Sequence, residues 1–105
     1  MADEILSLAI YEPLPGMEAQ SLTTMRQLMA ILHAHGYSRD LLYRAAEPGQ
    51  YVLLRYWKSE SARHSAQEDP EALRCWAKLA QEIRVVRIYE TLEDCGADPG
   101  AGAVQ

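Results

Sequence analysis

Two histidines are the first candidates for chemistry in this chain. His64 falls on a predicted short helix after Trp57, and His33 lies beside the apolar stripe of a longer predicted helix, about 40° from Met29 on a helical wheel. A neutral imidazole can take a phenolic proton near pH 7, so either histidine is a candidate catalytic base. An exposed helix histidine would explain His64 better than a catalytic role, and a boundary histidine that bonds the backbone would explain His33 equally well.

Two tryptophans are candidate walls of a binding pocket. The chain has two Trp, six Tyr and no Phe, so every large ring carries an N–H or O–H group that needs a partner when buried. The flat rings of Trp57 and Trp76 could stack on a planar aromatic substrate. Both could also be core residues, since the spacing of Trp76 from Leu73 and Ala80 is that of helix packing.

Further candidates fall on predicted strands. Tyr11 and Tyr89 would place hydroxyl groups on the sheet, and Arg55 would place a positive charge there. An inward guanidinium could stabilise the oxyanion that forms when a phenol is deprotonated. Strand arginines also pair with carboxylates at a rim or across a dimer interface. We take these three residues, with both tryptophans, as candidate substrate-binding residues.

Composition and motifs exclude several classes of protein. Ten Lys+Arg against fifteen Asp+Glu give a net charge of -5, which argues against nucleic acid or an anionic membrane as partner. Cys75 and Cys95 are too few for a disulfide framework or a zinc site, and we expect no bound metal or flavin. The acidic start, Met1–Glu4, is unlike a signal peptide, and no apolar run approaches the roughly 20 residues of a membrane span. We expect a cytoplasmic protein.

Seven segments have the periodicity of regular secondary structure. Alternating apolar residues predict strands over residues 5–11, 38–46, 51–57 and 84–91, and helical spacing predicts helices over 17–35, 59–66 and 69–82. The last helix is expected to bury Leu73, Trp76, Ala80 and Ile83, which leaves Cys75 accessible. We assign residues 1–94 to one domain and 95–105, with three of the six glycines, to a disordered tail.

The element order, β-α-β-β-α-β, predicts a ferredoxin-like α+β fold with a four-stranded antiparallel sheet. Right-handed crossovers would place the helices on one face of that sheet. The other face would then be a larger apolar patch than a monomer usually exposes. We therefore expect a homodimer in which two sheets pack face to face.

Three segments resemble the antibiotic biosynthesis monooxygenase (ABM) superfamily. They are Leu14–Glu18, Glu47–Leu53 and Tyr56–Ala62, and the resemblance covers about residues 5–92. It implies a dimeric α/β barrel. Members of this superfamily include cofactor-independent monooxygenases that form quinones, haem-degrading enzymes and isomerases of quorum signals.

The sequence departs from some of these relatives. Haem-degrading members have a Trp nine residues after the strand-ending Trp and a His ten residues further, where this chain has Ala66 and Trp76. They also have an Asn on the first strand, and residues 5–11 contain none. Other relatives have a His at the position of Ala66, whereas His64 lies nearly 160° away around a helix. Haem degradation is therefore disfavoured.

These observations predict an ABM-like protein that binds a small phenolic or quinone-like molecule between sheet and helices. His64 or His33 would remove a proton, and the resulting anion would react with O2 without a cofactor. Two alternatives remain open: a non-catalytic binding or interaction module on the same scaffold, and an isomerase of a small signal molecule.

Overall fold

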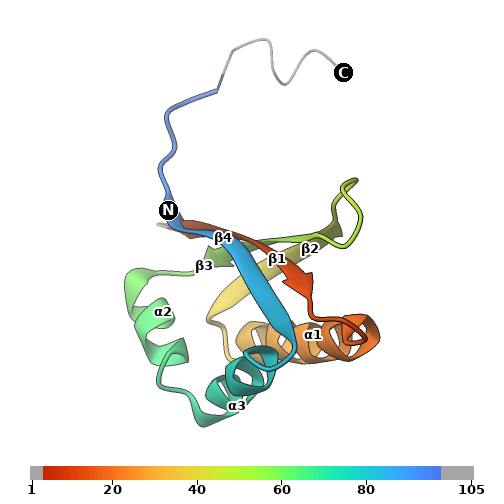
Figure 1. The fold of residues 1–105 in the computed structure, drawn as a ribbon. Helices are drawn as coiled ribbons and strands as arrows, with labels where there is room; N and C mark the ends of the chain where they lie inside the picture. Colours follow the sequence, from red (N-terminus) through yellow and green to blue (C-terminus); the bar gives the residue numbers. More distant parts are fainter. Residues whose placement is uncertain (1–3, 98–105) are drawn as a thin grey trace.

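The computed structural model describes residues 4–97 as one antiparallel sheet with helices on a single face (Figure 1). The elements are β1 (Ile5–Pro13), α1 (Glu18–Ala34), β2 (Ser38–Arg44), β3 (Tyr51–Trp57), α2 (Glu60–Ala66), α3 (Pro70–Leu79) and β4 (Ile83–Leu92). The strand order β2-β3-β1-β4 confirms the ferredoxin-like α+β prediction. None of the helices within residues 4–97 is long and apolar enough to cross a membrane. Most of the predicted tail, residues 98–105, lies outside the described residues.

Several element boundaries differ from the predicted ones: β2 ends at Arg44 instead of Ala46, the bounds of α1 and β4 differ by one residue, and β1 and α3 also differ. β1 continues past Tyr11 to Pro13 because its last two residues still pair with β4. β3 begins at Tyr51, opposite Tyr11, so Pro13 pairs only with β4. A proline there has no strand on its second side to bond. α3 ends at Leu79 instead of Glu82, because the Glu82 amide donates to the Leu79 carbonyl three residues back and closes a tighter turn.

The core lies between the helices and the sheet face that they cover. The predicted buried stripe of α3 is wrong, since Leu73 is 46% exposed whereas Cys75 is only 6% exposed. α3 packs against α1, and the small side chains of Ala72 and Cys75 let the two helices approach closely. The core residues are Tyr11, Met25, Leu28, Leu32, Tyr51, Leu53, Trp57, Ala66, Ala72, Cys75 and Leu79.

A bulge in β4 decides which of its side chains face the helices. Val85 lies opposite Tyr11 and Ile88 lies opposite Ala9, so both point to the same side of the sheet. These two β4 residues are three apart, and strict alternation would put them on opposite faces. Val86 is the extra residue that brings them to the same face.

Within residues 4–97 no helix lies over the opposite side of the sheet (Figure 1). The strand pairing identifies the side chains on this side, because residues directly opposite each other point to the same face of a sheet. Leu41 and Tyr43 on this side are 41% and 52% exposed. We call it the open face, and define it by Leu6, Leu8, Ile10, Leu41, Tyr43, Val52, Leu54, Tyr56 and Tyr89.

Candidate functional site

A cleft runs between the sheet and the helices and consists of two adjoining cavities. One has a volume of about 430 Å³, and the other has a volume of about 350 Å³. Ala9, Leu53, Arg55 and Ile88 line both cavities, so the two cavities lie side by side. The sheet strands β1, β3 and β4 contribute to both, α1 and α3 border the larger cavity, and α2 borders the smaller one.

The larger cavity is the apolar end of the cleft. Besides the four shared residues it is lined by Tyr11, Met25, Leu28, Trp76, Leu79, Ala80, Ile83 and Val85. The Tyr11 ring stacks on Tyr51 with ring centroids 5.5 Å apart. Burial raises the pKa of Tyr11 to about 12, and Tyr51 adds to the effect. The hydroxyl of Tyr11 therefore stays protonated at neutral pH, where it can donate a hydrogen bond but cannot act as a base.

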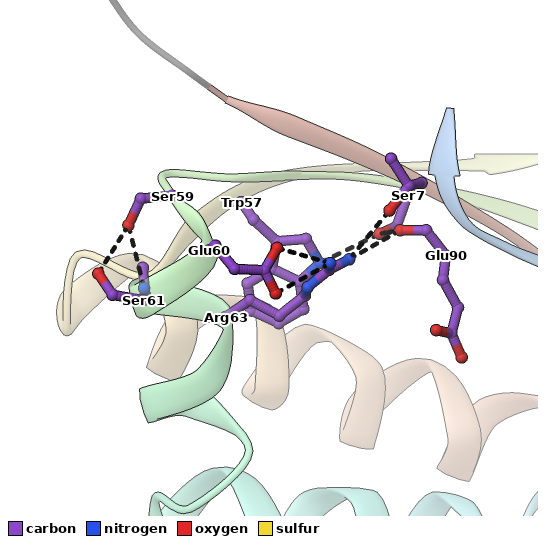
Figure 2. A network of polar contacts seen from close by, with 9 residues as sticks. Ser7, Trp57, Ser59, Glu60, Ser61, Arg63 and Glu90 are labelled. Carbon is purple, nitrogen blue, oxygen red and sulfur yellow. Dashed lines mark hydrogen bonds and ion pairs between the residues drawn. The ribbon is translucent and has the colours of Figure 1, made fainter. Parts of the chain in front are cut away.

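The smaller cavity is the polar end of the cleft, and Figure 2 shows the network along its wall. Trp57 Nε1 donates to Ser7 Oγ at 3.1 Å, and Ser7 Oγ donates to the Glu90 carbonyl at 2.6 Å. Arg63 Nη1 donates to the same carbonyl at 2.9 Å, while its Nη2 donates to Glu60 Oε1 at 2.8 Å. The Arg63 side chain thus joins α2 to β4 at this end of the cleft.

Arg55 lies where the two cavities meet. Its side chain is 8% exposed and pairs with Asp40, which is 1% exposed. Arg55 Nη2 and Nε donate to Asp40 Oδ2 at 2.7 and 2.9 Å, and Ser38 Oγ donates to Asp40 Oδ1 at 2.9 Å. Within residues 4–97 the Nη1 group of Arg55 has no hydrogen-bond partner. Asp40 therefore fixes the guanidinium and leaves its Nη1 amino group for a ligand.

The structure brings four of the five predicted binding residues together. Trp57 lines the polar end, Tyr11 and Trp76 line the apolar end, and Arg55 lies between them. Tyr89 does not join them: it lies opposite Leu8 on the open face and is 44% exposed. Its predicted place in the pocket is wrong because of the β4 bulge.

Both histidines lie outside the cleft. The His64 side chain is 72% exposed, and its Nε2 atom lies 3.4 Å from a Glu68 carboxylate oxygen. α2 turns Arg63 toward the cleft instead, and successive helix residues point about 100° apart. His33 is exposed and borders a separate hollow of about 210 Å³. Neither position supports the predicted role as the base of a reaction in the cleft.

Three residues that build the polar end were not among the predicted site residues. Asp40 could have been found from the hairpin, because the turn at residues 47–50 sets the register that places it opposite Arg55. The positions of Arg63 and Glu90 at the cleft depend on the rotation of α2 and on the β4 bulge, and no local sequence pattern predicts either feature. Within residues 4–97, no three His, Cys, Asp or Glu side chains gather where they could hold a metal ion.

Comparisons with known proteins find relatives by structure. No family model matches the chain, and no curated protein matches it. SnoaB, a cofactor-independent oxygenase from Streptomyces nogalater, is 19% identical and matches with a TM-score of 0.71 over 91% of this chain and 100% of that one. A candidate antibiotic biosynthesis monooxygenase from Chloroflexus aurantiacus is 11% identical, with a TM-score of 0.74 over 91% and 98% of the two chains. Another, from Nitrosomonas europaea, is 15% identical, with a TM-score of 0.69 over 91% and 97%. At these identities the likeness establishes the fold.

Proposed function

We propose a function from one premise: the chain has the fold of the antibiotic biosynthesis monooxygenase superfamily, which its sequence motifs predicted. The protein binds a small planar phenolic or quinone-like molecule in the cleft and oxidises it with O2, without a metal or flavin of its own. The observation that carries this proposal is the uncommitted Nη1 amino group of buried Arg55 at the boundary of an apolar cavity. That cavity, of about 430 Å³, is within the range of roughly 300–1,000 Å³ that is usual for small-molecule sites.

The cleft suits a ring system with one polar edge. Trp76, Leu79 and Val85 give the rings an apolar surface, while Arg55 faces the oxygen that loses its proton. A guanidinium fixed in advance stabilises the developing oxyanion without having to reorganise. The neutral Tyr11 hydroxyl is a second donor that can orient a carbonyl or phenol oxygen.

The oxidation balances for a hydroxyanthrone, a phenol with a ring methylene group. Removal of a methylene proton, or of the phenolic proton of the anthrol tautomer, gives an anion that is delocalised onto this ring carbon. The carbon then reacts with O2 and takes back a proton to give a hydroperoxide. Loss of water then leaves a carbonyl, so that a CH2 group and O2 become C=O and H2O. The methylene carbon gives up four electrons, and O2 accepts all four. The protein contributes orientation and charge stabilisation.

The proposal includes a homodimer formed through the open face. The open face joins apolar side chains from all four strands, among them Leu8, Leu41 and Leu54, in one continuous row of neighbours. Monomeric proteins seldom leave so large an apolar surface in water. A second copy of the chain offers the same surface, which fits an isologous two-fold contact. Cys75 and Cys95 are both free thiols, which is consistent with a cytoplasmic dimer.

A non-catalytic binding module is the second candidate. The position of His33 and His64 outside the cleft favours it, because a site without a histidine base could bind a ligand and leave it unchanged. The same observation counts against an isomerase that depends on His33 or His64.

One assay separates these functions. Purified protein is mixed with a panel of hydroxyanthrones in air-saturated buffer without flavin, and O2 uptake and quinone absorbance are followed. Oxidation faster than in buffer and in heat-denatured protein is the expected result, with His33→Gln and His64→Gln as active controls. Thermal protection by the compounds without turnover would support the binding module. If the compounds give neither turnover nor thermal protection, both candidates are refuted.

A further inference from the structure

Glu90 is a carboxylate at the polar end of the cleft that no charged group neutralises. Two glutamates line this end, and Arg63 holds one of them, Glu60, at 2.8 and 3.2 Å. The Glu90 carboxylate has neither a hydrogen bond nor an ion pair within residues 4–97. Figure 2 shows it directed from β4 toward the helix layer.

The main chain of Glu90 is fixed while its side chain is free. Its carbonyl accepts hydrogen bonds from Ser7 Oγ at 2.6 Å and from Arg63 Nη1 at 2.9 Å, so β1 and α2 both hold it. The bulge at Val86 brings Ile88 to the cleft side of β4, and Glu90, which lies in a second register shift between Tyr89 and Leu92, also lines the cavity. Glu90 is exposed, and from this anchored point it lines the cavity that Arg55 also lines.

We infer that the Glu90 carboxylate is the general base of the proposed reaction. It accepts the proton of the substrate phenol or ring methylene and becomes a carboxylic acid, and the substrate becomes an anion beside Arg55. A carboxylate is a weaker base than a phenolate, so the transfer depends on stabilisation of the anion in place. The guanidinium of Arg55 supplies that stabilisation through its uncommitted Nη1 group. The inference rests on the proposed function and names the base of the same site.

The other charged groups that line this cavity are few. Arg55 enters from β3, and Glu60 and Arg63 enter from α2. Glu60 is the poorer base because both of its carboxylate oxygens accept hydrogen bonds from Arg63 Nη2.

The test is Glu90→Gln, which keeps the size of the side chain and removes its basicity. We expect turnover of the hydroxyanthrone to fall by roughly 10²- to 10⁴-fold. Product affinity, measured by calorimetry, should change less than about threefold, because the amide still fits the cavity. We expect the rate of the wild type to fall toward acidic pH, and this fall should be absent from the residual activity of the variant.

Two further variants keep this test decisive. Glu93→Gln removes a nearby exposed carboxylate outside the cleft and should be as active as the wild type. Glu90→Ala should recover turnover on addition of formate, a small carboxylate that can enter the vacated space. An active wild type with an equally active Glu90→Gln variant would overturn the inference and leave the proposed function standing. A wild type that is inactive on the whole panel would overturn the proposed function, and the inference with it.

Discussion

Asp40 and Arg55 form an ion pair across the β2–β3 hairpin, with Oδ2 and Nη2 2.7 Å apart and both side chains more than nine-tenths buried. Removal of one partner leaves the other charge in a site that water scarcely reaches. The pair therefore links the stability of the sheet to the shape of the cleft.

Asp40→Asn should lower the free energy of unfolding by about 3–5 kcal/mol, the usual cost of breaking a buried pair. Urea denaturation followed by circular dichroism measures this loss. In the double variant Asp40→Leu/Arg55→Met both charges are absent, so stability should return to near the wild-type value. Its affinity for the ligand should be lower than that of the wild type, because the Arg55 guanidinium is absent. A single variant as stable as the wild type would show that the pair is exposed to water in solution.

Tyr37→Phe should reduce the loss of stability in acid. The Tyr37 hydroxyl donates to Asp69 Oδ2 at 2.8 Å, and this hydrogen bond is the main cause of the lowered pKa of Asp69. A carboxyl whose pKa is lowered on folding stabilises the fold above its ordinary value, 3.8, and this contribution is lost as the pH falls through the folded value. Without the hydrogen bond the contribution is smaller, so Tm at pH 7 drops and Tm falls less between pH 5 and pH 2.

The control for this prediction is Tyr43→Phe, which removes a 52% exposed hydroxyl from the open face. Its acid profile should match that of the wild type. Identical acid profiles for the wild type and Tyr37→Phe would contradict the role of this hydrogen bond.

Leu41→Arg should convert the protein to a monomer. Leu41 lies on the open face, 41% exposed, and a charge buried in a sheet-to-sheet contact is costly. Light scattering after size exclusion, at micromolar concentration, reads the mass directly. The matched control is Leu73→Arg, because Leu73 is 46% exposed but lies on α3, away from the open face. A wild-type protein that elutes as a monomer would rule out the dimer.

Glu82→Met should stabilise the fold. Glu82 is 4% exposed, and its Oε1 atom is buried without a hydrogen-bond partner within residues 4–97. An unsatisfied buried polar group costs about 1–3 kcal/mol, and the thioether of Met fills a similar length without that cost. Urea denaturation should show a higher midpoint at an unchanged slope, whereas Glu93→Met at an exposed site should change neither. A lower midpoint would show that the carboxylate has a partner such as an ordered water.

The sequence predicted the sheet and its helices because these depend on repeated signals. Alternation over several strand residues and capping groups such as Asp69 act locally, and the order of elements then leaves one compact topology. The rotation of the shorter helices carries a weaker signal. α3 has small residues, Ala72 and Cys75, on its packed side, so choosing the largest apolar residues gave the wrong face.

The candidate site was predicted in part for a related reason. Trp57, Trp76 and Arg55 follow the period of their elements and fall in the cleft as expected. On β4, strict alternation puts Val85 and Tyr89 on the same face, but the bulge at Val86 separates them. Bulges depend on contacts with the neighbouring strand, so a single sequence does not reveal them.

The two tryptophans of the chain both line the cleft, one at each end. All indole fluorescence therefore originates at the candidate site, without a background signal from elsewhere in the chain. Trp57 reports the polar end, where its N–H donates to Ser7, and Trp76 reports the apolar end. A quinone that enters the cleft comes close to both rings and quenches their emission. The protein thus carries its own optical probe of ligand entry, which needs neither a label nor a substitution.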